Sequence, residues 1–447
     1  MSAGRRLAGP ALAVVAIAAT LGTIELAARV SLPAALPRVA MYRPATGGVG
    51  YELIPGWRGT GPLGEGIRIN AAGLRGAEVG DRTARAHRAV VIGDSFTFGL
   101  GVAEADAWPA VLARAWGEEC IEVLNAGVPG YDLVQEARAL ARRVRELAPD
   151  LVIVGFLEND LYNPDGGDFV ATEEGTLAPR PEAVEAARSL NPFIALPGLA
   201  VQLQLHSAAF RAASYWAIRR RLAVHGDADL ARLAREVAAG TDLPTRLLRG
   251  EDDAATATRW AAAERELRAM ADVARGAGAR PVLVLLPRPE QLYASSLRGG
   301  FVRIRAMATE SGIQVVDATP SFAAAESRVG LYLFPADHHP SARGHAAIAA
   351  AVAGAVLPEG CRRQRASSEA DVSAGAGWRP SGSTVPQRPP AAAGDREGGA
   401  AAADARSGGS QSTALVRRRL WRSERSASRA SGERALRSVV DPTEDAG

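Results

Sequence analysis

Short apolar segments rich in Val, Ile and Leu alternate along this chain with longer stretches of helical periodicity. Continuous apolar runs of this kind are typical of strands covered on both faces, as in a parallel sheet. The alternation therefore predicts an α/β domain with right-handed crossovers between its strands. The predicted strands are residues 88–93, 121–127, 150–156, 280–287 and 313–318, and the predicted helices are residues 131–148, 257–275, 301–311 and 341–357.

Residues 161–250 interrupt this alternation. Because they follow the third predicted strand, we expect them to form a cap or lid near the carboxyl ends of the strands, where ligands bind in open α/β sheets. The segment contains no motif that indicates a substrate.

The chain begins with an apolar segment. Arg5 and Arg6 precede an uncharged run of 18 residues, 7–24, which as a helix would be about 27 Å long, just enough to span a bilayer. Small-residue cleavage patterns lie inside this run and none follows it, which favours an uncleaved anchor over a cleaved signal peptide or a buried soluble helix. Arginines on both sides of the run weaken any assignment of orientation.

The other end of the chain is of low complexity. Residues 362–447 are rich in Ala, Gly, Ser, Pro and Arg and lack apolar periodicity, which predicts a disordered tail. We therefore divide the chain into an anchor or signal (1–30), an approach segment (31–87), a catalytic domain (88–361) and this tail. The net charge of +3 is too near balance to indicate a nucleic-acid partner.

The most informative motif is "VVIGDSFTFG", in which a predicted strand ends at Gly93 and places Asp94 and Ser95 in a turn before a helix. A serine at that edge of a sheet can act as a nucleophile if a base and oxyanion donors lie nearby. Taken alone, a Gly-Asp-Ser turn is more typical of a simple turn or helix cap, and we expect Asp94 to support the turn.

The segment "DHHPSARGH", residues 337–345, supplies a candidate base. Asp337 and His339 are two residues apart, so both can point to one side of the backbone, with His338 pointing away. One imidazole on the serine and one carboxylate on that imidazole would complete a Ser–His–Asp arrangement. A metal site is disfavoured because His339 and His345 lie six residues apart with no Glu or Cys beside them; we expect a structural role for His345.

Four motifs in this order resemble the four blocks of SGNH (GDSL-type) hydrolases: "GDSFTFG" at 93–99, "NAGVPG" at 125–130, "END" at 158–160 and "DHHPSARGH" at 337–345. The approach segment "IRINAAGLRG" is similar to that of membrane-linked bacterial members. The resemblance implies a three-layer α/β/α sandwich with a five-stranded parallel sheet, flavodoxin-like in topology, which agrees with the predicted strands.

By this resemblance Ser95 is the nucleophile, His339 the base and Asp337 the residue that orients it. The backbone N–H groups of Ser95 and Gly130 and the side-chain amide of Asn159 would form the oxyanion hole. Taken alone, the 125–130 segment also reads as a strand-closing turn and Asn159 as a helix cap.

Two departures from the family pattern stand out. Many members carry the triad Asp three residues before the His, where this chain has Ala336; Asp337 resembles instead the Asp-x-His variant of envelope polysaccharide acetylesterases and acetyltransferases. Glu158 replaces the common small residue before Asn159. A carboxylate there would oppose a developing negative charge if it pointed inward, so we expect it to point out.

These residues together predict a membrane-anchored, extracytoplasmic serine esterase that needs no cofactor or metal. Its partners would be the membrane and an ester substrate, an O-acyl group on an envelope glycan or a lipid-like ester. An O-acyltransferase uses the same triad, and a catalytically silent glycan-binding or assembly protein can share the fold, so both alternatives stay open. In an extracytoplasmic setting, we expect Cys120 and Cys361 to form a bridge or lie near one another.

Overall fold

The computed structural model describes residues 3–31, 39–61, 63–82, 87–180, 199, 202–203, 206–221, 224–334, 337–356 and 361. The predicted tail, residues 362–447, lies outside the described residues.

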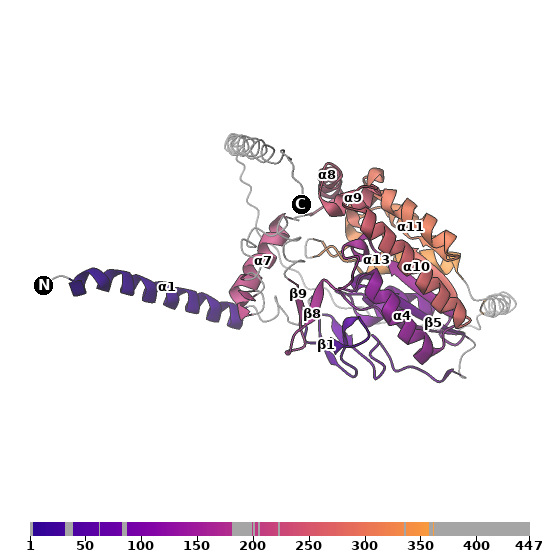
Figure 1. Ribbon diagram of the computed structural model, residues 1–447, viewed down its shortest axis with the longest axis horizontal. Helices are drawn as coiled ribbons and strands as arrows, with labels where there is room; N and C mark the ends of the chain where they lie inside the picture. Colours follow the sequence, from indigo (N-terminus) through magenta and orange to yellow (C-terminus); the bar gives the residue numbers. More distant parts are fainter. Residues whose placement is uncertain are drawn as a thin grey trace, which may run out of the picture. The chain divides into compact units, whose positions relative to one another are not determined.

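A five-stranded, wholly parallel sheet forms the centre of the fold (Figure 1), and its strands correspond to the five predicted from the sequence. They are β5 (His87–Gly93), β6 (Ile121–Asn125), β7 (Leu151–Phe156), β10 (Arg280–Leu285) and β11 (Gln314–Asp317). Their spatial order is β11-β10-β7-β5-β6. This is the flavodoxin-like order, whose topological switch point lies between β5 and β7.

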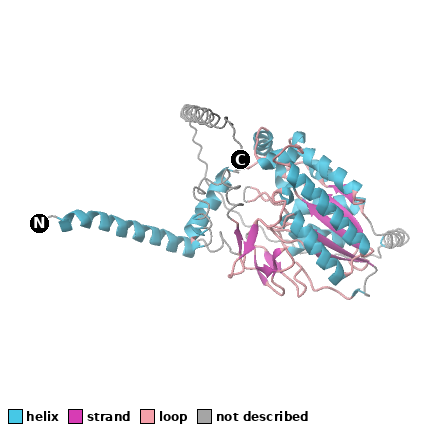
Figure 2. Ribbon diagram, in the orientation of Figure 1, coloured by secondary structure: helices cyan, strands magenta, loops and turns pink. Residues whose placement is uncertain are grey.

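The middle residues of the strands are apolar because helices pack against both faces of the sheet, and Figure 2 shows helices lying across it. Successive side chains point to opposite faces: Val90 and Ile92 belong to the core under α4, α10 and α11, whereas Ala89 and Val91 belong to the core under α3, α12 and α13. The predicted three-layer α/β/α sandwich is thus confirmed. The helices are α1 (Ala3–Ser31), α2 (Ser95–Phe98), α3 (Trp108–Trp116), α4 (Leu133–Leu147), α7 (Ala208–Arg221), α8 (Asp227–Ala238), α9 (Leu243–Arg249), α10 (Ala257–Gly276), α11 (Gly299–Glu310), α12 (Thr319–Ala323) and α13 (Ala342–Ala355).

Short elements fill the connections. The 3₁₀ helices are η2 (Glu104–Asp106), η3 (Glu158–Leu161), η5 (Pro289–Leu292), η6 (Ser295–Arg298) and η7 (Val329–Leu331). Three antiparallel pairs lie outside the main sheet: β1 (Tyr42–Ala45) with β2 (Gly50–Leu53), β3 (Arg58–Thr60) with β4 (Gly66–Arg68), and β8 (Phe169–Ala171) with β9 (Leu177–Pro179).

The residues before β5 pack against the α/β sandwich. Tyr51 on β2 stacks edge-on against Tyr131, with ring centroids 5.2 Å apart, in an apolar cluster that also contains Phe98 and Val128. The Tyr131 hydroxyl donates to the Tyr51 carbonyl at 2.5 Å. This segment therefore supports the loops that follow β5 and β6.

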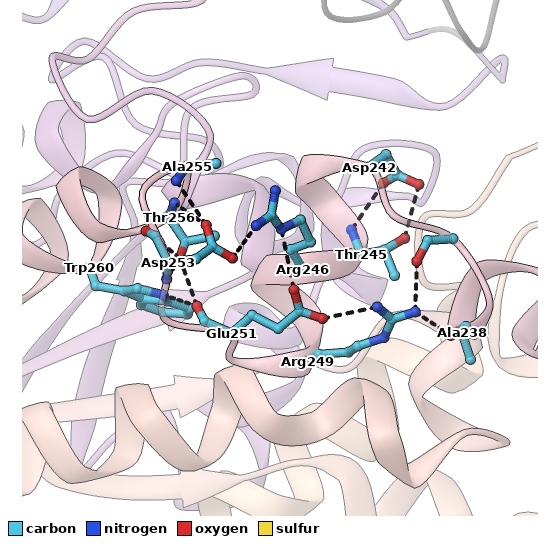
Figure 3. A network of polar contacts seen from close by, with 11 residues as sticks. Ala238, Asp242, Thr245, Arg246, Arg249, Glu251, Asp253, Ala255, Thr256 and Trp260 are labelled. Carbon is cyan, nitrogen blue, oxygen red and sulfur yellow. Dashed lines mark hydrogen bonds and ion pairs between the residues drawn. The ribbon is translucent and has the colours of Figure 1, made fainter. Parts of the chain in front are cut away.

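The described part of the 161–250 segment contributes β8, β9, α7, α8 and α9. Helix α8 contacts η5, and α9 contacts η3, η6 and α11, so both lie against connections that follow the carboxyl ends of β7 and β10. Figure 3 shows how this segment joins α10. Arg246 and Arg249 on α9 both bind the Glu251 carboxylate. The backbone carbonyl of Glu251 accepts a hydrogen bond from the Trp260 indole N–H at 2.8 Å.

Helix α1 contains a stretch of 20 residues, Leu12–Ser31, with a mean hydropathy of 1.7. By length and composition it qualifies as a membrane anchor or a signal sequence. Near its end, Glu25 accepts hydrogen bonds from the backbone N–H groups of Ala208 and Ala209, at 2.9 and 3.1 Å, at the start of α7.

Cys120 and Cys361 form a disulfide with their Cα atoms 5.8 Å apart, as predicted. The bond ties the residue before β6 to the segment after α13, and both cysteines are buried in the core beneath α3 and α13.

Candidate active site

Ser95 begins the short helix α2 at the carboxyl end of β5. Only a glycine fits before the turn, since a Cβ at Gly93 would lie 2.1 Å from Thr97 Oγ1 and 3.1 Å from the Gly155 carbonyl oxygen. Asp94 caps the helix by accepting the Phe96 N–H at 2.8 Å. This turn presents Ser95 at the switch point between β5 and β7, where sites form in this topology.

The buried carboxyl group of Asp94 connects the first and third motifs. Its Oδ2 accepts the Asn159 side-chain amide at 3.2 Å and lies 3.5 Å from Ser95 Oγ. Burial raises the pKa of Asp94, although the hydrogen bonds from Phe96 and Asn159 oppose that rise. Asn159, which follows β7, is thus held beside the serine.

His339 joins Ser95 to Asp337. Its Nε2 lies 2.8 Å from Ser95 Oγ and its Nδ1 lies 2.5 Å from Asp337 Oδ1. The His339 backbone N–H also donates to Asp337 Oδ1, at 3.0 Å. With Nδ1 protonated and facing the carboxylate, Nε2 is free to accept the serine proton.

The electrostatics of this pair suit a general base. Burial alone would lower the pKa of His339, but the charge and hydrogen bond of Asp337 outweigh it, so the pKa lies above its ordinary value of 6.5. Burial works against ionisation of Asp337, yet His339 lowers the pKa of that carboxyl to about 2. Asp337 therefore stays ionised and stabilises the imidazolium that forms when His339 takes a proton.

The other two histidines of this segment lie elsewhere. The His338 ring packs against Phe334, and its Nδ1 lies 4.0 Å from Glu290 Oε1. His345 is fully buried, accepts the Trp108 backbone N–H at 3.3 Å through Nδ1, and has its pKa lowered by burial to about 3. Among the described residues, no group of three or more His, Cys, Asp or Glu side chains is arranged to hold a metal ion.

Two backbone donors lie in the motif loops. Neither Ser95 N–H nor Gly130 N–H donates a hydrogen bond within the part of the chain that the structure describes. Gly130 has a φ of +82°, and a Cβ there would lie 2.8 Å from Tyr51 Oη and 3.1 Å from Phe169 Cδ2. The left-handed backbone and the close neighbours both require glycine at this position.

Asn125, at the end of β6, makes hydrogen bonds that stabilise the turns after β5 and β6. Its side-chain amide donates to the carbonyls of Thr97 and Phe98, at 3.2 and 3.1 Å, and its Oδ1 accepts the Gly127 N–H at 3.1 Å. The strand-closing interpretation of this asparagine is thus the one that its contacts support.

Sequence reasoning missed Arg75, a buried residue of the approach segment. Its guanidinium donates to the carbonyls of Phe98, Gly99 and Val102, at 2.7, 2.5 and 2.7 Å. A cation at the carboxyl end of α2 complements the helix dipole and fixes the turn that carries Ser95. In the sequence, the only signal for Arg75 was its position in the motif "IRINAAGLRG" of the approach segment.

A group of buried carboxyls behind the nucleophile turn was also missed. Glu136 on α4 is fully buried, and neither of its carboxyl oxygens has a hydrogen-bond partner among the described residues. Burial, reinforced by the charges of Asp94 and Asp132, raises the pKa of Glu136 well above its ordinary value. Burial among other acidic groups thus favours the protonated form of Glu136. The helical pattern of α4 masked it, because an acid in the first turn of a helix is ordinary.

The expectation that Glu158 points outward is wrong. Its side chain is buried, pairs with the Arg288 guanidinium and accepts a hydrogen bond from the Tyr162 hydroxyl at 2.6 Å. A buried ionic partner 130 residues away in the chain carries no local sequence signal.

Comparison with known proteins agrees with the motifs. Residues 91–252 match the model of the GDSL-like lipase/acylhydrolase family. The matched region includes Ser95, Gly130 and Asn159 and ends before Asp337. A search of curated proteins found no match.

Several solved structures are similar at low identity. TesA is 14% identical, with 59% of this chain and 95% of that chain covered and a TM-score of 0.33. A G-D-S-L family lipolytic protein from Desulfitobacterium hafniense is 14% identical over 60% and 99% of the chains, with a TM-score of 0.33. A catalytic mutant of Axe2, an acetylxylan esterase from Geobacillus stearothermophilus, is 16% identical over 62% and 96%, with a TM-score of 0.31.

Proposed function

We propose that this chain, which belongs to the GDSL-like lipase/acylhydrolase family and is a serine hydrolase of the SGNH type, cleaves esters through an acyl intermediate on Ser95. One observation carries this assignment of roles: His339 lies within hydrogen-bond distance of both Ser95 Oγ and the Asp337 carboxylate. A serine with a base, and a base with an orienting carboxylate, is the arrangement that nucleophilic acyl transfer requires.

In the first step, Ser95 Oγ attacks the ester carbonyl while His339 Nε2 takes the hydroxyl proton. The tetrahedral intermediate collapses as the ester C–O bond breaks, and His339 returns the proton to the leaving alcohol. Water then attacks the acyl-serine, again with His339 as the base, and releases the carboxylic acid and free Ser95.

The negative oxygen of each tetrahedral intermediate needs donors. We assign this role to the N–H groups of Ser95 and Gly130 and to the Asn159 amide. The two N–H groups have no other acceptor within the described residues, and Asn159 is held beside Ser95 through Asp94. Donors fixed in advance stabilise the oxyanion without reorganisation.

We assign the substrate to O-acyl esters of an envelope glycan or lipid-like esters. The Asp337-x-His339 spacing resembles that of envelope polysaccharide acetylesterases and acetyltransferases, and α1 has the length and hydropathy of a membrane anchor. In this proposal the anchor holds the catalytic domain on the extracytoplasmic side, where the Cys120–Cys361 disulfide is stable.

The test is an ester panel of short and long p-nitrophenyl acyl chains, measured with the detergent-solubilised full chain. Ser95→Ala should lower kcat by about 10⁴-fold or more, because the triad acts as a unit. Ser296→Ala, at an exposed serine on η6, is the matched control and should leave kcat unchanged. Wild-type turnover in Ser95→Ala would contradict the proposal. Transfer of the acyl group to an added sugar in preference to water would instead indicate an acyltransferase.

A further inference from the structure

Glu158 presents an electrostatic problem for an oxyanion hole. It directly precedes Asn159, and its side chain is only 4% exposed. Its carboxylate lies close enough to Asp94 to help raise the pKa of that buried acid, after the larger effect of burial. Asp94 in turn contacts both Ser95 and Asn159. An uncompensated charge at Glu158 would therefore oppose the negative charge that develops beside Ser95.

Arg288 compensates that charge. Its Nη1 pairs with Glu158 Oε1 and also donates to the Tyr162 hydroxyl at 3.3 Å. Tyr162 Oη donates to the same carboxylate oxygen at 2.6 Å, and the Tyr162 backbone N–H donates to the Asn159 carbonyl at 3.0 Å. The guanidinium, the phenol and the carboxylate thus form a clamp around η3, the turn that carries Asn159.

The clamp is anchored in the loop after β10. The Arg288 N–H donates to Gln291 Oε1 at 2.8 Å, and the Pro287 carbonyl accepts the Tyr332 hydroxyl at 2.9 Å. Glu290 lies 3.4 Å from the Arg288 Nε, so one arginine faces two carboxylates. The loops that follow β7 and β10 are therefore held together through Arg288.

We propose that Arg288 is a positioning residue for the oxyanion hole: through its ion pair with Glu158 it holds η3 in place and offsets the negative charge of that carboxylate beside Asn159. This inference rests on the proposed esterase function. It also explains how the chain accommodates Glu158 where a small residue is common.

The test is a double-mutant cycle of Arg288→Met, Glu158→Gln and the double variant, measured as kcat and KM on the ester that the wild type cleaves best. Arg288→Met should lower kcat by about 10²-fold with little change in KM, because it misplaces η3 and exposes a buried charge to the oxyanion. Glu158→Gln should have a smaller effect. The double variant should be more active than Arg288→Met, since the uncompensated charge is gone.

The split between kcat and KM, together with the recovery of kcat in the double variant, is a readout that a merely structural role would not move.

Arg328→Met is the matched control. Arg328 stacks on Tyr293, with its guanidinium carbon 4.8 Å from the ring centroid, and donates to the Leu292 carbonyl at 3.0 Å. It should leave kcat unchanged. Equal losses from Arg288→Met in the wild-type and Glu158→Gln backgrounds would overturn the inference while leaving the esterase function intact.

An inactive wild type would contradict the proposed function instead.

Thermal unfolding of the wild type, the two single variants and the double variant tests the clamp without turnover. Arg288→Met should destabilise the protein, and adding Glu158→Gln should restore part of the lost stability. Additive stability effects would overturn the ion-pair half of the inference.

Discussion

His339 Nε2 lies 2.8 Å from Ser95 Oγ although 244 residues separate the two in the chain. The loop that carries His339 is fixed by its own backbone: the Leu333 N–H donates to the His339 carbonyl at 2.9 Å and the Ser341 N–H to the Leu331 carbonyl at 2.9 Å. Helix α13, which follows, packs on α3. His339 is therefore held beside Ser95 by residues that lie outside the sheet.

Replacing the two adjacent histidines in parallel tests the choice of base. His339→Ala should reduce kcat by about 10⁴-fold or more, because no other described imidazole contacts Ser95. His338→Ala should retain most activity, since its ring faces Glu290 and Phe334. Steady-state kinetics on one ester compares them; greater damage from His338→Ala would reverse the assignment.

Activity should fall on the acid side of the pKa of His339, which Asp337 holds above 6.5. Only the neutral imidazole accepts the serine proton, so kcat/KM is lost as pH falls through that value. Asp337→Asn removes the charge that favours the imidazolium, so the acid limb should move to lower pH while kcat drops about 10⁴-fold. A pH–rate profile of each protein measures this; an unmoved limb would mean that Asp337 does not set it.

Asn159→Ala should lower kcat by about 10²- to 10³-fold with a much smaller change in KM, as expected for one lost oxyanion donor. Asn163→Ala is the matched control, because Asn163 lies just beyond η3 and donates to Asp168. Steady-state kinetics separates the two parameters. A pure KM effect would make Asn159 a substrate-positioning residue.

Glu136→Gln should stabilise the protein at neutral pH. The raised pKa keeps Glu136 protonated in the folded state, whereas the unfolded chain releases that proton above the ordinary value of 4.5. Stability is therefore lost as pH rises from about 4.5 towards the folded-state pKa, and an amide avoids this loss. Urea unfolding across pH measures the difference. Glu146→Gln, at a largely exposed site on the same helix, should show no such trend, and a parallel pH dependence in both variants would contradict the prediction.

Removing the disulfide should destabilise the fold by about 2–5 kcal/mol, since it closes a loop of 241 residues between Cys120 and Cys361. Thermal unfolding of Cys120→Ala/Cys361→Ala against wild type gives the size of the effect. Intact mass after alkylation checks the bond itself: two alkylated thiols in unreduced protein would contradict it.

The sheet could be predicted because its signal is local. A strand buried on both faces is apolar over most of its length, and the segments around Val91, Ile153 and Val284 satisfy this condition without reference to the rest of the chain. The nucleophile turn is local as well, since Gly93, Asp94 and Ser95 form it within three residues. The order of the four motifs supplied the remaining candidates.

The sequence by itself thus determined the α/β class, the five strands and the candidate triad. Only the tertiary structure decided which groups meet: Arg288 with Glu158, Arg75 with the carboxyl end of α2, and buried Glu136 with Asp94. These contacts join segments that are distant in the chain. Burial, which sets the cost of each charge, depends on what the whole fold excludes from water, so no pattern within one segment can encode it.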